Sequence, residues 1–241
     1  MSTPDGISDL HLPQWKRIID LACCALALPF LALLALIMAI VTRLFAPGPV
    51  LFCQERVGCA GGRFRIYKFR TMRVGSDTQG HQDYVKNLID TNAPMAKLDS
   101  QGDSRLIPGC WLLRASGLDE LPQIINILRG EMSVVGPRPC LPAEFDAYRP
   151  EQRERCQAMP GLTGLWQVSG KNRTTFEEMI RLDIRYVRTK SLWLDIKIIL
   201  LTVPALVEQI YEVRLKRKSS LAPAPATPLP AMKRSGTGAS I

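Results

Sequence analysis

An uncharged apolar run near the N-terminus constrains this chain more than any other feature. From Leu21 to Val41 it reads LACCALALPFLALLALIMAIV and holds no charge. A helix of ~20 such residues is long enough to cross a bilayer. A signal peptide is disfavoured, because the stretch ahead of the run is long and no small-residue cleavage site follows. A buried core helix is also disfavoured, because the run is apolar all round. The run predicts a membrane-embedded helix.

Pro29 lies inside this run and leaves two topologies open. Proline removes a backbone donor and clashes with the preceding turn, so a helix kinks or breaks there. Lys16 and Arg17 precede the run and Arg43 follows it, whereas a spanning helix has its flanking cations mainly on the cytoplasmic side. Cations at both ends suit a re-entrant helix–break–helix whose two ends stay cytoplasmic. A kinked spanning helix is an equal alternative on these grounds, because such helices tolerate proline.

Positive charge is concentrated at the C-terminal end. The formal net charge is +9, but six cations and no acidic residue follow Glu212, which leaves +3 for the rest of the chain. A nucleic-acid-binding domain usually carries its cations on the folded surface, so no nucleic-acid partner is expected. A basic tail suits an anionic membrane surface. From Ser219 the Ala/Pro/Ser-rich composition predicts disorder.

Cysteine and histidine usage excludes two kinds of site. The seven cysteines are odd in number and form no CxxC pair, so neither a disulfide framework nor a zinc site is expected. Reduced thiols indicate a cytosolic compartment for the main domain. His11 and His81 are single and distant in sequence, and we expect neither to bind a metal.

Two β-favouring runs flank a glycine-rich turn after the apolar run. In VLFCQERVGCAGGRFRIYKFRTM they lie on either side of Gly58 to Gly62, which is typical of a β-hairpin. Cations at the end of the second run cannot be buried unpaired, so they face solvent or an anion. By the period of two, four side chains share one face of that run: Phe64, Ile66, Lys68 and Arg70.

Three helices are expected further along the chain. PQIINILRG has Pro122 at a favoured first-turn position and Gly130 where helices commonly end. TTFEEMIRLDIRYVRTK has Thr174 or Thr175 as its N-cap. SLWLDIKIILLTVPALVEQIYEV is apolar-rich, is expected to break near Pro204 and suits the membrane interface. A polar stretch before them contains HQDYVKNLID, which predicts a short helix.

Two adjacent carboxylates, Asp119 and Glu120, precede the first of these helices in GLDELPQIINILRG. A helix N-terminus stabilises a nearby anion by ~0.3–1 kcal/mol, so capping explains most strings of this kind. Dispersed cations favour chemistry instead. They are Arg114 upstream, Arg138 in the stiff segment GPRP downstream, and Lys68 with Arg70 on the hairpin.

Carboxylates among dispersed cations are what phosphoryl transfer needs. The cations stabilise the phosphate charge, and a carboxylate can attack phosphorus to form an acyl phosphate. Magnesium, with carboxylate and phosphate ligands, suits such a site. No Walker A, GxGxxG or HExxH pattern occurs, so ordinary nucleotide-triphosphate and zinc-hydrolase schemes lack support.

These motifs resemble the compact form of the bacterial sugar transferase family, the monotopic polyprenyl-phosphate phosphoglycosyl transferases. The similar stretches run in family order from Lys16 to about Glu208. They are KRIIDL, PGPVLFCQERVG, FRIYKFRTM, LRASGLDELPQIINILRGEMSVVGPRP, PGLTGLWQVSGKN, LDIRYV and LWLDIKII.

The resemblance implies an enzyme that transfers sugar-1-phosphate from a nucleoside diphosphate sugar, usually a UDP-sugar, to polyprenyl (undecaprenyl) phosphate and releases UMP. It implies Asp119 as the nucleophile of a ping-pong reaction, and Glu120 as a magnesium ligand or general acid/base. It also makes the re-entrant interpretation of Pro29 the favoured one. The residues expected to hold the diphosphate or the carrier phosphate are Lys68, Arg70, Arg114, Arg138, Lys171 and Asn172.

The expected fold is α+β, mostly helical with a small β-hairpin, and anchored by the Pro-broken re-entrant helix. We expect an N-terminal tail over 1–15, a membrane helix over 16–46, a cytosolic catalytic domain with interfacial C-terminal helices over 47–212, and a basic disordered tail over 213–241. The resemblance implies the bacterial inner membrane, the catalytic domain on its cytoplasmic face, and the first membrane step of a glycan or exopolysaccharide pathway.

Two alternatives keep the anchor but change the function: a non-enzymatic membrane adaptor acting through the basic tail, and a membrane phosphatase using an aspartyl-phosphate. The ordered array of motifs disfavours the adaptor. The chain also departs from the family pattern without losing a charged site residue. Gly117 replaces a common serine, Leu28 precedes Pro29 in place of serine, and Asp103-Ser104-Arg105 with Ile107 and Cys110 stands for DxRxTxxG.

Overall fold

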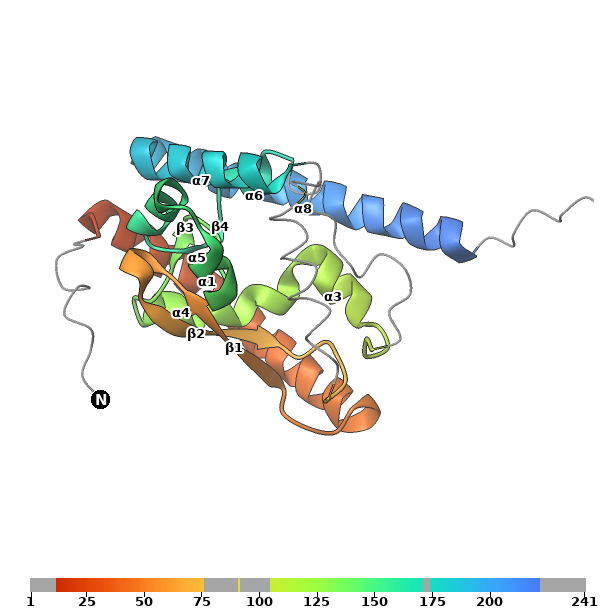
Figure 1. Cartoon of the computed structure of the whole chain (residues 1–241). Coiled ribbons are helices and arrows are strands. Elements are labelled where there is room, and N and C mark those ends of the chain that lie inside the picture. The colour runs from red at the N-terminus through yellow and green to blue at the C-terminus, as the bar shows by residue number, and fades with distance from the viewer. Residues whose placement is uncertain (1–11, 76–90, 92–104, 171–173, 222–241) are drawn as a thin grey trace, which may run out of the picture.

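Two long helices frame the molecule. In the computed structural model, which describes residues 12–75, 91, 105–170 and 174–221, these helices are α1 (Gln14–Phe45) and α8 (Leu192–Leu221). They start close together, where Lys16 bonds Asp195, and then diverge (Figure 1). The shorter elements lie around and between them.

Within the described residues, these shorter elements form two small sheets and a set of short helices. The strands are β1 (Leu51–Val57), β2 (Arg63–Phe69), β3 (Ser133–Val135) and β4 (Gly161–Thr163). The α-helices are α3 (Cys110–Ser116), α4 (Ile124–Leu128), α5 (Pro142–Ala147), α6 (Leu165–Val168) and α7 (Phe176–Thr189). The 3₁₀ helices are η1 (Cys59–Gly61), η3 (Leu118–Gln123) and η4 (Pro150–Gln157). This mostly helical architecture with little strand confirms the α+β class at that level.

The predicted hairpin is confirmed. β1 and β2 pair antiparallel around the glycine-rich turn. Ile66 is buried in a core cluster with Ile124 and Ile127 of α4, and Phe64 packs against that cluster. The second sheet, in which β3 pairs parallel with β4, was not predicted, because three-residue strands show no periodicity.

One stripe of α1 is buried along nearly the whole helix, although the sequence is apolar on every side. The helix is long and apolar enough to cross a membrane by length and composition. Its other faces carry exposed apolar side chains, such as Leu26 at 83% and Leu44 at 68% exposure. The stripe recurs at helical spacing and consists of Lys16, Asp20, Cys24, Leu34, Met38 and Thr42.

Neither long helix is divided at its proline. α1 continues through Pro29 and α8 through Pro204 as single helices, so the interruptions expected there are not present. Both proline rings lie on the exposed side of their helix. There the missing N–H and any local bend leave the packed stripe undisturbed.

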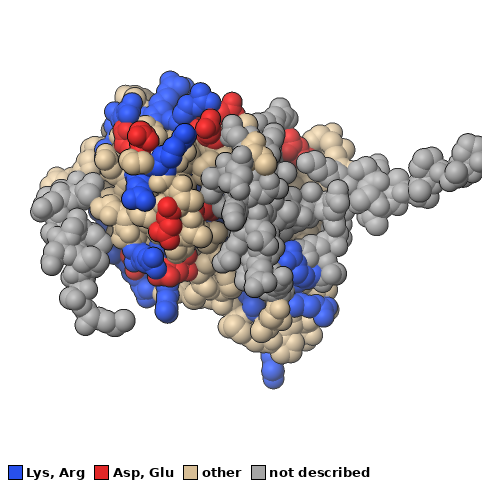
Figure 2. Space-filling model, in the orientation of Figure 1, with Lys and Arg blue, Asp and Glu red and all other residues tan. Residues whose placement is uncertain are grey.

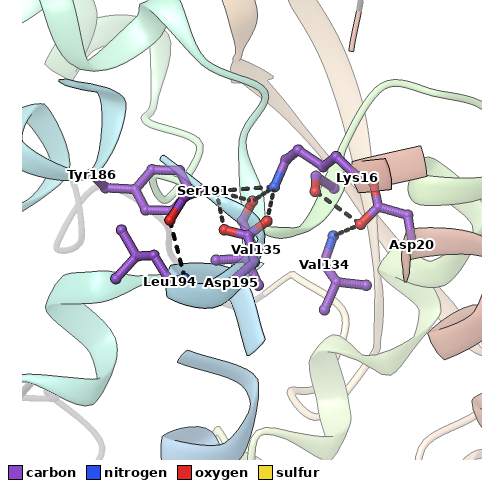
Figure 3. A network of polar contacts seen from close by, with 9 residues as sticks. Lys16, Asp20, Val134, Val135, Tyr186, Ser191, Leu194 and Asp195 are labelled. Carbon is purple, nitrogen blue, oxygen red and sulfur yellow. Dashed lines mark hydrogen bonds and ion pairs between the residues drawn. The ribbon is translucent and has the colours of Figure 1, made fainter. Parts of the chain in front are cut away.

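Polar side chains at the start of α1 join it to three other elements (Figure 3). Lys16 donates to the main-chain oxygen of Val135 at 2.8 Å, to the Tyr186 hydroxyl at 2.9 Å and to Asp195 Oδ2 at 2.6 Å. One turn later, Asp20 Oδ1 accepts from the main-chain N–H of Val134 at 2.8 Å. The first turns of α1 are therefore bonded into the domain at β3, α7 and α8.

The remaining helices differ from expectation mainly at their ends. The helix predicted to begin at Pro122 starts a turn earlier as η3, and Gly130 follows α4 with a left-handed φ of 77°. Thr175 caps α7 and forms a capping box with Glu178, as expected. α8 continues to Leu221, so the boundary expected at 212 lies inside it. Lys, Arg and Leu favour helix there, and the Ala/Pro-rich composition begins only after Leu221.

Several predictions concern residues outside the described part of the chain. These include the short helix in HQDYVKNLID, and both histidines. The rest of the basic tail, after Leu221, also lies outside the described residues. These predictions stay as stated.

Replacing Lys16 with alanine tests how strongly α1 is fixed. Lys16 and Asp195 have side chains 4% and 2% exposed, and removing one partner leaves a buried charge uncompensated. We expect the free energy of unfolding to fall by ~3–5 kcal/mol, measured by urea unfolding in detergent micelles. Arg149→Ala removes the exposed pair with Glu177, whose side chains are 67% and 49% exposed, and should change little. Equal losses in both variants would contradict this.

Candidate functional site

Asp119 and Glu120 lie in the first turn of η3, as predicted. No side chain caps η3, a six-residue 3₁₀ helix, because its N-cap is Gly117, a residue without a side chain. Gly117 has a φ of 71°, in the left-handed region, where glycine is favoured over residues with a side chain. Asp119 is 9% exposed.

Glu120 joins two of the predicted cations. Lys68 Nζ lies 2.7 Å from Glu120 Oε1, and Arg138 Nη1 lies 3.8 Å from the same oxygen. The strand β2, the helix η3 and the segment after β3 thus meet at one carboxylate. All three side chains line a pocket, together with Arg56, Ile66, Gln123, Pro139, Gly161 and Gln167.

The pocket holds more positive than negative side chains. Arg56, Lys68 and Arg138 face Glu120, and Asp119 is close enough to act on the charge of Lys68. Burial lowers the pKa of Lys68, an effect that Glu120 opposes. Burial also lowers the pKa of Arg56 to about 10, and Arg138 acts in the same direction. A bound anion would relieve this excess of positive charge, so the pocket is suited to a phosphate group.

Arg138 is presented by a segment outside any helix or strand, Gly136 to Pro139, here called the strap. Its base requires close backbone approach: a Cβ on Gly136 would lie 2.1 Å from the Met159 carbonyl oxygen. Gly161 N donates to the Pro137 carbonyl at 2.8 Å, which fixes the start of the strap against β4. The stiffness expected from GPRP is thus reinforced by packing.

Two of the predicted cations lie on another side of Asp119. Arg70 donates to the main-chain oxygens of Ala46 and Pro49, both at 2.5 Å, where α1 ends. Arg114 Nη1 donates to Thr71 Oγ1 at 3.2 Å. The Cys110 thiol is within electrostatic reach of Asp119, Arg114 and Arg70. Neither arginine is among the pocket-lining residues, so their substrate contacts stay a prediction.

The last two predicted site residues, Lys171 and Asn172, lie outside the described part of the chain. They follow Gly170, directly after α6, which supplies Gln167 to the pocket. Their role in holding phosphate therefore stays a prediction.

Three of the pocket residues with polar side chains were not predicted from the sequence: Arg56, Gln123 and Gln167. The hairpin contained a signal for the first. In the antiparallel register Arg56 is opposite Phe64, and opposite residues share a face, so Arg56 lies on the face of Lys68. Gln123 follows Glu120 by three residues, the period of a 3₁₀ helix. Gln167 had no comparable signal.

Carboxylates available for a metal are few. Among the described residues, no group of three or more His, Cys, Asp or Glu side chains is arranged to hold an ion. Asp119 and Glu120 could supply at most two ligands. Magnesium often binds through one or two carboxylates, with substrate phosphates and water completing its shell, and the donor set fits that mode.

Comparisons with known proteins agree with the geometry. The family model for bacterial sugar transferases matches residues 12–209. A UDP-glucose:undecaprenyl-phosphate glucose-1-phosphate transferase of Caulobacter vibrioides is 42% identical over 200 residues, 80% of this chain and 69% of the relative. The galactosyl transferase CpsE of Streptococcus agalactiae is 40% identical over 78% of this chain and 41% of its own. The exopolysaccharide production protein ExoY of Rhizobium meliloti is 36% identical, over 79% and 84%.

The lowered pKa of Lys68 gives a pH dependence to anion binding. A lysine with a lowered pKa loses its charge at lower pH than usual, so affinity for pyrophosphate should fall as pH rises from neutral toward the ordinary lysine pKa. Lys68→Arg stays charged and should shift that fall to higher pH. Calorimetric titration across this range measures both proteins. Identical pH profiles would show that Lys68 does not hold the anion.

Proposed function

The chain belongs to the bacterial sugar transferase family, and on that premise we propose that it transfers sugar-1-phosphate from a nucleoside diphosphate sugar to polyprenyl phosphate. A UDP-sugar is the proposed donor and UMP the product. The similar transferase of Caulobacter vibrioides carries this activity in its name, with glucose as the sugar and undecaprenyl phosphate as the acceptor. The chain is an enzyme of this phosphoglycosyl transferase kind.

The observation that carries the proposal is the pocket of Arg56, Lys68 and Arg138 around Glu120, beside Asp119. In the first half-reaction an Asp119 oxygen bonds to the sugar-bearing phosphorus. The bond from that phosphorus to the UMP phosphate oxygen breaks, and UMP leaves. In the second, an oxygen of polyprenyl phosphate attacks the same phosphorus and releases the Asp119 carboxylate.

The cations stabilise the phosphate charge during both transfers. Lys68 and Arg138 approach the pocket from different elements, so a phosphoryl group between them would be held from two sides. Arg56 adds a third charge behind them. Glu120 orients both Lys68 and Arg138 before substrate arrives, which reduces the reorganisation needed in the transition state.

Magnesium is part of the proposal. Asp119 and Glu120 would hold it together with the donor diphosphate, since the protein supplies few ligands of its own. When bound, the ion would neutralise charge on the leaving phosphate. Glu120 would then exchange part of its contact with Lys68 for the ion.

The apolar helix α1 supports membrane attachment. The contacts of α1 with the domain indicate how the helix runs relative to the membrane. The N-terminal half contacts the domain at Cys24, which clusters with Ile124 and Ile127. The C-terminal half contacts the same domain at Leu34 and Met38. A 32-residue helix is ~48 Å long, so one that crossed a ~30 Å hydrocarbon core would carry one end away from the domain. The proposed topology is therefore an anchor whose two ends stay on one side of the bilayer, as in the re-entrant prediction, but without the break expected at Pro29.

Exposed apolar side chains continue from α1 to α8. Leu112 of α3 is 39% exposed, and α3 packs against both long helices. On α8, Trp193, Val207 and Tyr211 are 79%, 61% and 63% exposed. Where α1 ends, Figure 2 shows Lys and Arg without Asp or Glu among the described residues of that face. We propose contact with anionic headgroups there, with the catalytic domain on the cytoplasmic face of the bacterial inner membrane.

The adaptor and phosphatase functions are less favoured. An adaptor would not need a pocket with three cations, and the similar proteins of Caulobacter vibrioides and Streptococcus agalactiae are named as transferases. A phosphatase would use water in the second half-reaction, so it would release free sugar phosphate without any polyprenyl phosphate. An assay of UMP and free sugar phosphate, with and without polyprenyl phosphate, therefore separates the three functions.

Replacing the nucleophile tests the mechanism. Asp119→Asn should abolish UMP release from a panel of UDP-sugars with polyprenyl phosphate and magnesium, because an amide cannot form the acyl phosphate. A labelled donor should also leave no covalent adduct on the variant. Asp146→Asn, which changes an exposed carboxylate of α5, should keep both. Full turnover of Asp119→Asn would contradict the nucleophile assignment.

Thiol labelling tests the topology. Cys53 is exposed on β1 and reports on the main domain, while Ser2→Cys in a Cys53→Ser background reports on the N-terminus. With a membrane-impermeant maleimide, both thiols should react in inverted membrane vesicles and resist in right-side-out ones. Reaction from opposite sides would show a spanning helix.

A further inference from the structure

A buried guanidinium, that of Arg155, lies behind the strap. Its partner is Asp183, whose Oδ2 lies 2.5 Å from Arg155 Nη2, and the two side chains are 2% and 1% exposed. Neither belongs to the pocket lining. A buried ion pair is weak evidence for stability, because well-packed apolar side chains avoid its desolvation cost. The Arg155–Asp183 pair is therefore better explained by a role in function than by a contribution to stability.

Arg155 is held from two sides and offers a donor to a third. Its Nη1 donates to the Tyr148 hydroxyl, and its Nη2 bonds Asp183. The same Nη2 donates to the main-chain oxygen of Arg138 at 3.0 Å. The guanidinium is planar and rigid, so fixing it on Tyr148 and Asp183 also fixes where it meets the strap.

The strap depends on donors from outside. Because the strap forms no helix, its carbonyls cannot accept hydrogen bonds from its own N–H groups. Two of its four residues are also prolines, which lack an N–H. Gly161 N donates a hydrogen bond to the Pro137 carbonyl at 2.8 Å, and Arg56 Nη1 donates one to the Pro139 carbonyl at 3.3 Å. The carbonyl between these two is that of Arg138, and it accepts its hydrogen bond from Arg155.

We propose that Arg155, oriented by Asp183 and Tyr148, is a positioning residue for Arg138. It fixes the main chain from which the Arg138 side chain reaches Glu120 and the transferred phosphoryl group. A shift of ~1 Å at such a site can cost ~10²-fold in rate. The inference rests on the proposed function, because the reaction is what gives Arg138 its task.

Arg155→Lys tests the planar, multiply bonded guanidinium without removing the positive charge. Lysine still neutralises Asp183 but cannot span Tyr148, Asp183 and the strap as a planar group does. We expect a folded protein whose turnover falls ~10- to 100-fold. The matched control is Arg188→Lys. Arg188 bonds Glu154 at 2.6 Å and also joins α7 to η4, but it is exposed, and its turnover should be unchanged.

A double-mutant cycle separates positioning from general stability. In an Arg138→Ala background there is no guanidinium left to position, so Arg155→Lys should lower residual turnover by less than about twofold. A merely structural role would lower turnover by the same factor in both backgrounds. Equal factors, or an Arg155→Lys protein as active as the wild type, would overturn the proposal. The affinity for the UDP-sugar is measured in the same four proteins, because we expect Arg138→Ala to turn over slowly.

A second variant tests the same role if Arg155→Lys fails to fold. Tyr148→Phe removes only the hydroxyl that receives Arg155 Nη1 and keeps the ring in its core cluster. It should reduce turnover in the wild-type background and have less than about a twofold effect beside Arg138→Ala. A wild-type protein that releases no UMP from any UDP-sugar would refute the proposed function. An active wild type with an additive cycle would refute only the positioning role.

Discussion

The segment from Ser133 to Cys140 runs from β3 through the strap without forming a helix, and such a chain cannot satisfy its own backbone polar groups. The surrounding elements supply the missing partners, and each is thereby fixed against one stretch of backbone. Arg138 stands near its middle, so the packing of distant elements determines where one pocket cation lies. The donors come from four different elements: Lys16 of α1, Gly161 of β4, Arg56 of β1 and Arg155 of η4.

Charge imbalance explains why the pocket suits phosphate chemistry. Buried cations without enough carboxylates are costly in an empty site, and the lowered pKa values of Arg56 and Lys68 express that cost. Glu120 compensates for only part of it. The same excess stabilises a diphosphate and the charge that develops when one of its bonds breaks.

The sequence contained much of this site but not its arrangement. The turn at Gly58 to Gly62 predicted the hairpin, and Thr175 the start of α7, because both signals are local. The gathering of Lys68, Glu120 and Arg138 followed from motif chemistry, whereas their contacts depend on tertiary packing. Arg56 was missed although the strand register places it on the face of Lys68. The β3–β4 pairing was missed because such short strands carry no pattern.

The anchor and the catalytic site are parts of one packed unit. Asp20 accepts a hydrogen bond from the Val134 main chain, and Lys16 donates to the Val135 carbonyl, directly before the strap. A polar residue at the start of a membrane helix is costly unless it is paired, and here its partners include main-chain groups of β3, the strand that leads into the strap. The position of α1 in the membrane and that of the strap therefore cannot change independently. On the proposed topology, a domain that must meet a lipid phosphate gains from this coupling, because the strap moves together with α1.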